Sequence, residues 1–397
     1  MSIHIPHGFR FAGVHCGIKR NRDKPDLTLV VADRPVTAAG VYTQNRICAA
    51  PVQWDRQQTP NGHTRAVVIN SGNANACTGP QGLEDAKSMC ALAAEACQLS
   101  SEGVLVMSTG IIGQPLPMEK IAAGITAAAG QLAADQPAVQ DAARGIMTTD
   151  TVPKWASRAL ELPGKTVRLL GLAKGAGMIG PQMATMLGLI VTDAALAPDA
   201  AQEMLADVCD QTFNCISVEG HTSTNDTVIL LASGAAAAEP LSGPDRQAFH
   251  TVLLDLCAQL ARSIPADGEG ATHLITIDVR GCQQPADARR IARSVANSPL
   301  VKTAIAGGDP NWGRIVSAAG YAGVEFDADQ VDLEINGYAV YRQGAPLAFD
   351  AAEVSGSIRA QRETSIELSV GRGPAAARFW TTDLTAEYVQ INADYHT

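Results

Sequence analysis

Apolar residues follow two different periods along this chain. Near 27–31, 66–69 and 104–106 they alternate with polar or small residues or form short runs, a pattern typical of β-strands. Elsewhere they recur at helical spacing. The clearest case is a helix expected from about 244 to 262, whose apolar stripe is Phe249, Val252, Leu253, Leu256 and Leu260. Further strands are expected near 167–170, 187–191 and 275–279, so strands and helices share the first 280 residues.

The last part of the chain has a different pattern. Apolar residues alternate from Val331 to Ile335, stop at Asn336-Gly337 and resume at Tyr338, which predicts a hairpin with a two-residue turn. Because hairpins mix with helices, we expect an α+β fold instead of a doubly wound parallel sheet. A smaller α+β domain is expected after about residue 280.

Composition narrows the classes of function. The chain has 397 residues, of which 46% are hydrophobic and 18% charged, and its net charge is -10. Without a basic run it lacks the face that binds nucleic acid or an anionic membrane. No apolar run approaches the ~18 residues of a membrane span, and the first residues do not resemble a signal peptide. Nine cysteines without a CxxC pair indicate reduced thiols, and we expect a cytoplasmic location.

Six segments are richer in Gly, Thr, Asn and Asp than their surroundings: 108–110, 147–151, 174–186, 219–227, 267–270 and 307–314. The segment 174–186 is neither a Walker A loop nor a GxGxxG motif, so it is either a flexible loop or a Gly-rich backbone beside a hydroxyl nucleophile. A threonine nucleophile needs a positioned base, and the amine of an N-terminal threonine is one solution. The turn at 108–110 has backbone N–H groups that can stabilise an oxyanion. No metal-ligand spacing is present, and His221 is the only histidine inside a polar cluster.

The motifs, in their order along the chain, resemble the glutamate N-acetyltransferase/ornithine acetyltransferase family of the arginine pathway. The resemblance rests on VINSGNANACTG (68–79), STGIIG (108–113), IMTTDTVPK (146–154), AKGAGMIGPQMATML (173–187), STNDT (223–227), DGEGATHL (267–274), NSPLVKTA (297–304), GGDPNWGR (307–314) and the terminal YVQINADYHT. It implies a layered α/β/β/α sandwich of the ornithine acetyltransferase and DmpA-like kind, followed by the smaller C-terminal domain.

The resemblance also implies a precursor that cuts itself between Ala184 and Thr185. The products are an α chain (1–184) and a β chain (185–397), and the family suggests an α2β2 heterotetramer. Residues 185–280 would complete the catalytic domain, and 281–397 would form the smaller one. Thr185 would take acetyl from N2-acetylornithine and pass it to glutamate in a ping-pong reaction. No cofactor or metal is implied; acetyl-CoA is a second donor for some members, which leaves open whether this chain is bifunctional.

The family's functional residues carry over to named positions of this chain. Thr109 and Gly110 match the oxyanion pair. The substrate-binding positions are Thr148, Lys174, Thr185, Glu269, Asn392 and Thr397. A lysine suits the substrates' α-carboxylate, and a glutamate suits the ornithine ammonium. Chain ends usually fray, whereas the resemblance predicts that this tail docks into the active site.

Some positions depart from the family pattern, and other functions stay open. Gln182 stands where members often have Asn, Gly180 adds flexibility beside the cut, and His221 stands where an acidic residue is expected. The motifs 223–227 and 307–314 are interpreted as turns that hold the walls of the site. One rival is an N-terminal-nucleophile amidohydrolase or aminopeptidase, with water as acceptor. The other is a non-enzymatic binding protein that keeps the fold.

Overall fold

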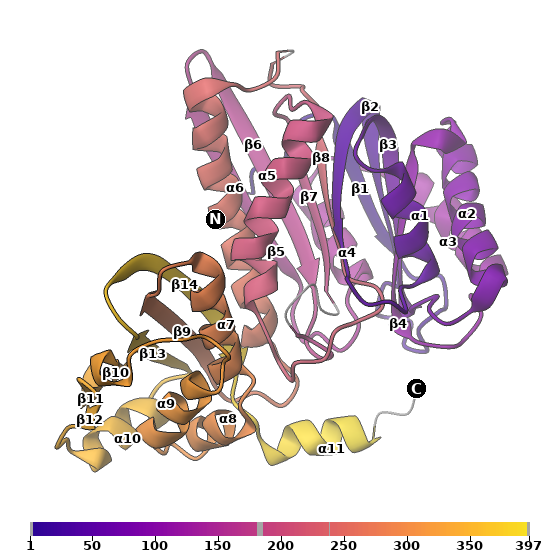
Figure 1. Cartoon of the computed structure of the whole chain (residues 1–397). Helices are drawn as coiled ribbons and strands as arrows, with labels where there is room; N and C mark the ends of the chain where they lie inside the picture. Colours follow the sequence, from indigo (N-terminus) through magenta and orange to yellow (C-terminus); the bar gives the residue numbers. More distant parts are fainter. Residues whose placement is uncertain (1–2, 181–185, 238, 395–397) are drawn as a thin grey trace.

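Two β-sheets with helices on their faces make up the described part of the chain (Figure 1). The computed structural model describes residues 3–180, 186–237 and 239–394. The first sheet has the strand order β4-β3-β2-β8-β7-β6-β5, and β1 pairs with β2. Its strands are β1 (Phe9–Val14), β2 (Leu27–Tyr42), β3 (Asn61–Asn73), β4 (Val104–Ile111), β5 (Lys154–Leu162), β6 (Lys165–Lys174), β7 (Leu187–Thr192) and β8 (Thr227–Ala232).

Alternation along the strands builds the layers of this sheet. In β2, Leu27, Leu29 and Val31 pack toward one group of helices, whereas Val30 and Ala32 face an inner core shared with β6, β7 and β8. The outer helices beside β1–β4 are α1 (Ala50–Gln58), α2 (Gly79–Ala96) and α3 (Met118–Ala129). Those beside β5–β8 are α5 (Pro198–Gln211) and α6 (Gly243–Ala266), and α4 (Gln136–Gly145) packs in the inner core. Helices therefore cover the outer face of this sheet and an apolar core fills its other face, which confirms the expected α+β fold.

The helix expected at 244–262 is α6, and its predicted stripe faces the core. Phe249, Leu253, Leu256 and Leu260 are at most 1% exposed, and the cluster they join also holds apolar residues of β6 and β7. The helix is longer than expected, because it continues through Ile264 and an internal Pro265 to Ala266. It therefore ends directly before the 267–270 segment that the sequence singled out.

A second sheet forms the C-terminal lobe, in the order β12-β11-β10-β13-β9-β14. Its strands are β9 (Leu274–Gly281), β10 (Asp332–Ile335), β11 (Tyr338–Arg342), β12 (Ala345–Pro346), β13 (Glu363–Ser369) and β14 (Gly373–Thr382). Its helices are α7 (Pro285–Ala296), α8 (Pro299–Ala306), α9 (Trp312–Gly320) and α10 (Ala351–Arg359). Short 3-10 turns are η1 (Ser101–Gly103), η2 (Phe213–Cys215) and η3 (Ala328–Gln330). The predicted hairpin is β10–β11, where Asn336 and Gly337 both have positive φ, as a type I′ turn requires.

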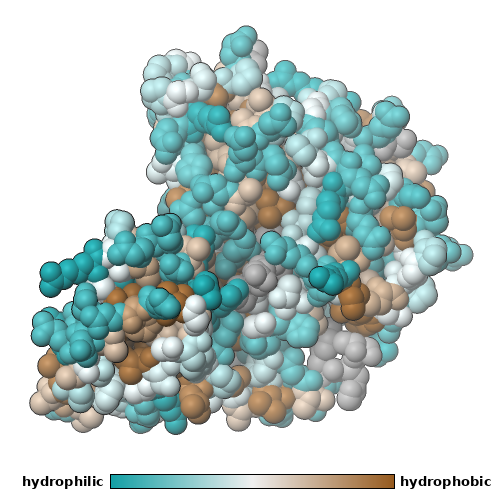
Figure 2. Space-filling model, viewed as in Figure 1, coloured by the Kyte–Doolittle hydropathy of each residue, from teal (hydrophilic) through white to brown (hydrophobic). Residues whose placement is uncertain are grey.

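The last described helix, α11 (Ala386–Asp394), leaves the C-terminal lobe and runs below the first sheet toward the ends of its strands (Figure 1). Hydrophilic side chains cover most of the face in Figure 2, and a hollow separates the two lobes on its left side. None of the described helices is long and apolar enough to cross a membrane. The division of the precursor into chains and domains at 184 and 280 stays a prediction.

Candidate active site

Several predicted site residues lie at strand ends of the first sheet. Thr109 and Gly110 are near the end of β4, which pairs in parallel with the end of β3. Lys174 is the last residue of β6 and lies opposite Leu187, the first residue of β7. The sequence pattern placed Lys174 in a Gly-rich loop; in the structure that loop begins one residue later. The sheet thus brings the oxyanion pair and the lysine to one edge.

A cavity of about 270 Å³ opens at this edge. Every predicted site residue that the structure describes lines it: Thr109, Gly110, Thr148, Lys174, Glu269 and Asn392. They come from five separate segments, so the fold brings together what is dispersed along the chain. Ala184, Thr185 and Thr397 lie outside the described residues.

The turn that carries the oxyanion pair needs glycine at position 110. Gly110 has a φ of +132°, a conformation that side chains rarely adopt, and a Cβ there would collide with the backbone of Gly72 and Asn73. Ser108, just before the pair, is buried, and its hydroxyl donates to Oδ1 of Asn70 at 2.6 Å. Gly110 therefore packs so closely on the backbone of β3 that only glycine fits there.

Asn225, which sequence reasoning had assigned only to a wall-forming turn, holds this turn directly. Its Nδ2 donates to the carbonyl oxygens of Ser108 at 2.8 Å and Ala74 at 2.6 Å, and Asn225 itself lines the cavity. The STNDT motif is therefore part of the site wall. Its richness in Asn and Thr was the sequence signal, but its partners lie more than 100 residues away in the chain.

A buried charge network supports the lysine side of the cavity, and sequence reasoning missed its centre, Asp150. Oδ1 of Asp150 accepts from Nζ of Lys154 and from the N–H of Gly175, both at 2.7 Å. Its Oδ2 accepts from the N–H of Thr148 at 2.9 Å. One carboxylate therefore fixes Thr148 and the residue that follows Lys174.

Burial and opposite charges compete in this network. Burial alone would raise the pKa of Asp150, but Lys174 and Lys154 outweigh it and lower the pKa to about 2. Burial lowers the pKa of Lys174 and the nearby charge of Lys154 adds to that shift, while the charge of Asp150 is the main opposing cause. Nζ of Lys174 donates to Oγ1 of Thr109 at 3.4 Å. The ammonium group is thus held beside Thr109, one of the two predicted oxyanion residues.

The opposite wall is made by Glu269 and the last described helix. The N–H of Glu269 donates to the carbonyl of Ala176 at 2.9 Å, and its Oε2 accepts from Nδ2 of Asn392 at 3.1 Å. A Cβ on Gly177 would collide with the Glu269 carboxylate, so the Gly-rich loop packs directly on this side chain. The C-terminal segment up to Asn392 therefore reaches the cavity.

The described residue that follows Thr185 is anchored by a second missed carboxylate. The N–H of Met186 donates to Oδ1 of Asp226 at 3.0 Å. Asp226 is fully buried, and burial raises its pKa well above the ordinary range, against the N–H of Met186 and the charge of Lys174. Its Oδ2 has no hydrogen-bond partner among the described residues. A neutral carboxyl is therefore favoured beside the start of β7.

Two features singled out in the sequence lie away from the cavity lining. In the 307–314 motif, Asn311 caps α9 by accepting from the N–H of Arg314, and Trp312 stacks on Tyr341 with ring centroids 5.2 Å apart. These contacts hold the C-terminal lobe together. His221 is exposed and does not line the cavity.

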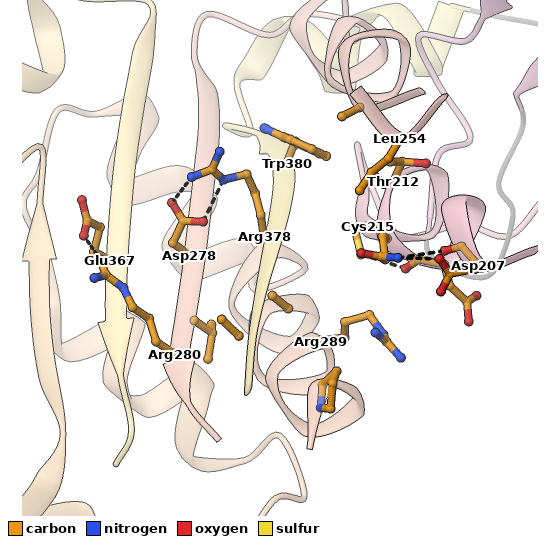
Figure 3. Close-up of a pocket in the computed structure, with 17 residues that line it drawn as sticks. Asp207, Thr212, Cys215, Leu254, Asp278, Arg280, Arg289, Glu367, Arg378 and Trp380 are labelled. Carbon is orange, nitrogen blue, oxygen red and sulfur yellow. Dashed lines mark hydrogen bonds and ion pairs between the residues drawn. The ribbon is translucent and has the colours of Figure 1, made fainter. Parts of the chain in front are cut away.

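A larger cavity of about 940 Å³ lies between the lobes and contains none of the predicted site residues. Helices α5 and α6 line one side, and strands β9 and β14 the other (Figure 3). Its strand residues are paired with one another: Arg378 donates to Asp278 at 2.8 and 2.9 Å, and Arg280 pairs with Glu367. Its charges are therefore largely compensated within the protein.

No group of three or more His, Cys, Asp or Glu side chains is placed to hold a metal ion in residues 3–180, 186–237 and 239–394. The expectation that the chain needs no cofactor stays a prediction.

Comparisons with known proteins agree with the motifs. The model of the ArgJ family matches residues 10–397. The arginine biosynthesis bifunctional protein ArgJ of Rhodopirellula baltica is 49% identical, over 99% of this chain and 96% of its own length. The protein of the same name from Symbiobacterium thermophilum is 47% identical, over 100% and 98%.

Two solved structures are also similar to this chain. A crystal structure of the arginine biosynthesis bifunctional protein ArgJ from Bacillus halodurans is 38% identical and has a TM-score of 0.50, covering 51% of this chain and 96% of its own. An ornithine acetyltransferase from Mycobacterium tuberculosis, solved with ornithine, is 37% identical with a TM-score of 0.39, covering 45% and 95%. With a family model spanning nearly the whole chain and relatives close to half identical over full length, this protein belongs to the ArgJ family.

Proposed function

We propose that this protein transfers the acetyl group of N2-acetylornithine to glutamate, giving ornithine and N-acetylglutamate, after cutting itself between Ala184 and Thr185. The observation that carries the proposal is the cavity that unites Thr109, Gly110 and the four described substrate-binding candidates. Family membership supports the same reaction, since the relatives are named as arginine biosynthesis proteins. The Bacillus halodurans chain matches over almost its whole length yet covers 51% of this chain, so it is about half as long, as one product of such a cut would be.

Maturation precedes turnover in this scheme. The Thr185 hydroxyl attacks the Ala184 carbonyl, the peptide bond becomes an ester, and water hydrolyses the ester. The products are a carboxylate at Ala184 and a free amine on Thr185. That α-amine has an ordinary pKa of about 7.7–8.0, so its neutral form is available as a base near neutral pH.

Acetyl transfer then proceeds in two half-reactions. The Thr185 oxygen attacks the acetyl carbonyl, and its proton passes to the α-amine. The oxyanion is stabilised by the N–H of Gly110 and by a hydrogen-bond donor of Thr109. Each donor contributes about 3 kcal/mol by analogy with other acyl-transfer enzymes. The C–N bond breaks, ornithine nitrogen takes the proton, and acetyl stays on Thr185 as an ester. The glutamate amine attacks that ester and reverses the sequence.

The remaining cavity residues divide the recognition of substrate. Lys174 suits the α-carboxylate that both amino acids carry, and Glu269 with Asn392 suits the far end of the side chain. Acetyl-CoA is a further donor in this proposal, in keeping with relatives named bifunctional. We also propose an α2β2 assembly and a cytoplasmic location.

Acetyl transfer is tested with acetyl-labelled N2-acetylornithine and mass spectrometry. Labelled N-acetylglutamate and ornithine should form in equal amounts, and without glutamate one acetyl group should remain per Thr185. Continuous release of acetate without glutamate would favour the amidohydrolase. An assay with acetyl-CoA as the sole acetyl donor tests for the second activity. Zero turnover in this assay would make the enzyme monofunctional.

Maturation is tested by denaturing gel and intact mass. The wild type should give two pieces of roughly 19 and 22 kDa by share of length from the 41.4 kDa chain, whereas Thr185→Ala should stay whole. An intact wild-type chain without turnover would support the binding-protein alternative.

A further inference from the structure

The proposed function sets an electrostatic problem for this cavity. Ornithine carries a side-chain ammonium, and glutamate carries a side-chain carboxylate, yet a ping-pong reaction places them in one site in turn. Glu269 attracts the first and repels the second. A site with fixed charge would therefore favour one substrate at the expense of the other.

Glu219 is a second carboxyl group next to this site, and nothing in the reaction above uses it. Both of its carboxyl oxygens are buried, and neither makes a hydrogen bond of good geometry among the described residues, although the backbone N–H groups of His221 and Ile179 lie close enough to lower its pKa. Unpaired buried carboxyl oxygens are rare in proteins and need an explanation. The residue begins the EGHTSTNDT segment, whose later members already form the cavity wall.

The backbone places Glu219 behind the Glu269 wall. The N–H groups of residues 218–220 all point to the carbonyl of Ile179, at 2.8 to 3.3 Å. A Cβ on Gly180 would collide with the backbone of Gly220, so the Gly-rich loop and the Glu219 segment are in close contact. The same loop packs on Glu269 through Gly177. Glu219 does not line the cavity, so it is close enough to influence Glu269 only by its charge.

Charged and titratable groups face Glu219 from each element packed against it. Burial raises its pKa to about 8, the charge of Glu269 adds to the shift, and the backbone N–H groups of His221 and Ile179 and the charge of Lys302 oppose it. Lys302, on α8, is itself buried, and burial lowers its pKa to about 7. Tyr388, on α11, has its pKa raised to about 12, mainly by burial and further by Glu219 and Glu269. Glu219 thus lies within the electrostatic reach of the site.

We propose that Glu219 is a positioning residue that adapts the charge of the site to its two substrates. Its carboxyl is ionised while the cationic side chain of N2-acetylornithine or ornithine occupies the cavity, and protonated while the anionic side chain of glutamate does. A cation in the cavity releases the Glu219 proton to solvent, and an anion draws a proton back. This inference rests on the proposed function.

Proton release on ornithine binding tests the proposal directly. Binding enthalpies of ornithine are measured at pH 8 in buffers of different ionisation enthalpy, for the wild type, Glu219→Gln and Glu219→Asp. The wild type should release a fraction of a proton, Glu219→Gln should release clearly less, and Glu219→Asp should keep the release. The exposed Glu387→Gln on α11 is the matched control and should behave as the wild type. Equal release in the wild type and Glu219→Gln would overturn the proposal.

Kinetics give a second readout. The ratio of kcat/KM for N2-acetylornithine to kcat/KM for glutamate should rise between pH 7 and 9 in the wild type. The rise should be on the order of tenfold, since one pKa unit of linkage corresponds to a factor of ten in binding. In Glu219→Gln this contribution should be absent, so the ratio should rise less steeply with pH than it does in the wild type. The Thr185 amine and the substrates titrate equally in both proteins, so a ratio with the same slope in both would overturn the proposal.

The outcomes separate this inference from the proposed function. A wild type without acetyl transfer would refute the function, whereas normal transfer with no effect of Glu219→Gln would refute only the role of Glu219. If Glu219→Gln fails to fold, Glu219→Asp decides. Its shorter side chain should move the midpoint of the kinetic ratio along the pH axis, and an unmoved midpoint would overturn the proposal.

Discussion

Nδ2 of Asn392 donates a hydrogen bond of 3.1 Å to Oε2 of Glu269, across 123 positions of sequence. The same nitrogen donates to the carbonyl of Tyr388 at 3.0 Å, so the amide is oriented by its own helix. Both residues line the cavity. Asn392, near the end of α11, is therefore positioned to orient the carboxylate that we expect to meet substrate.

Deletion of residues 392–397 should raise KM for N2-acetylornithine at least tenfold and lower kcat, because Glu269 loses its orienting partner and the tail leaves the site. The α11 residues from Asn392 onward are exposed, so the thermal midpoint should change by less than about 2 °C. Steady-state kinetics and thermal unfolding check both expectations. Val389→Ala, at a position 61% exposed on the same helix, is the control and should be neutral. Full activity of the truncated protein would refute docking of the tail.

Local pattern predicted the elements well because it reflects local physics. The type I′ turn at Asn336-Gly337 and the inward stripe of α6 follow from backbone preference and from one-sided burial. Long-range partners leave no such trace. The parallel register that sets Gly110 against Gly72, and the bonds from Asn225 to Ser108, depend on strands pairing far along the chain.

The candidate site could also be predicted only in part from the sequence. Recognisable motifs identified the residues that line the cavity, whereas the groups that hold them were missed. In the sequence, Asp150 and Asp226 look like ordinary turn residues. Only the structure shows that both are buried and that their carboxyl oxygens accept hydrogen bonds from backbone N–H groups and, for Asp150, from Lys154. The tail shows the opposite case: general physics predicted fraying, and the family resemblance predicted docking. In the structure Asn392 reaches Glu269.

Asp150→Asn should destabilise the protein by about 3–5 kcal/mol at pH 7, because the buried Lys174 loses its main opposite charge and Lys154 keeps only its pair with Asp267. The lowered pKa of Asp150 means that its contribution is fully present above the ordinary value of 3.8 and is lost as the pH falls toward about 2. Urea unfolding from pH 7 down to pH 3 measures this difference.

The difference between Asp150→Asn and the wild type should therefore be constant from pH 5 to 8 and shrink only in acid. The exposed pair of Arg144 and Asp141 is the control, and Asp141→Asn should change stability by less than about 0.5 kcal/mol. A loss for Asp150→Asn no larger than that of the control would contradict the network.

Gly110→Ala should lower kcat by about 10²–10³-fold, the usual result of displacing one oxyanion donor. The new Cβ would collide with the backbone of Gly72 and Asn73 at a φ that alanine disfavours, so the N–H must move. Gly113→Ala is the matched control: its φ is +81°, but nothing lies within 4 Å of the added Cβ. Its free energy of unfolding should fall by only about 1 kcal/mol, the cost of an unfavourable backbone conformation, and its kcat should stay close to that of the wild type. Equal kcat in the two variants would argue against an oxyanion role for Gly110.

Glu219→Gln should make the protein more stable than the wild type at pH 8. At pH 5 this advantage should be smaller. The pKa of Glu219 is raised from 4.5 to about 8, so the folded state binds more protons than the unfolded state between these values. Stability from this group is fully present below pH 4.5 and is lost as the pH rises through about 8. Glutamine cannot ionise, so its advantage at pH 8 should exceed that at pH 5 by on the order of 1–3 kcal/mol, since each pKa unit of linkage corresponds to about 1.4 kcal/mol. Urea midpoints at pH 5, 6.5 and 8 measure the trend, and an advantage that does not grow with pH would show that Glu219 titrates like an exposed carboxyl.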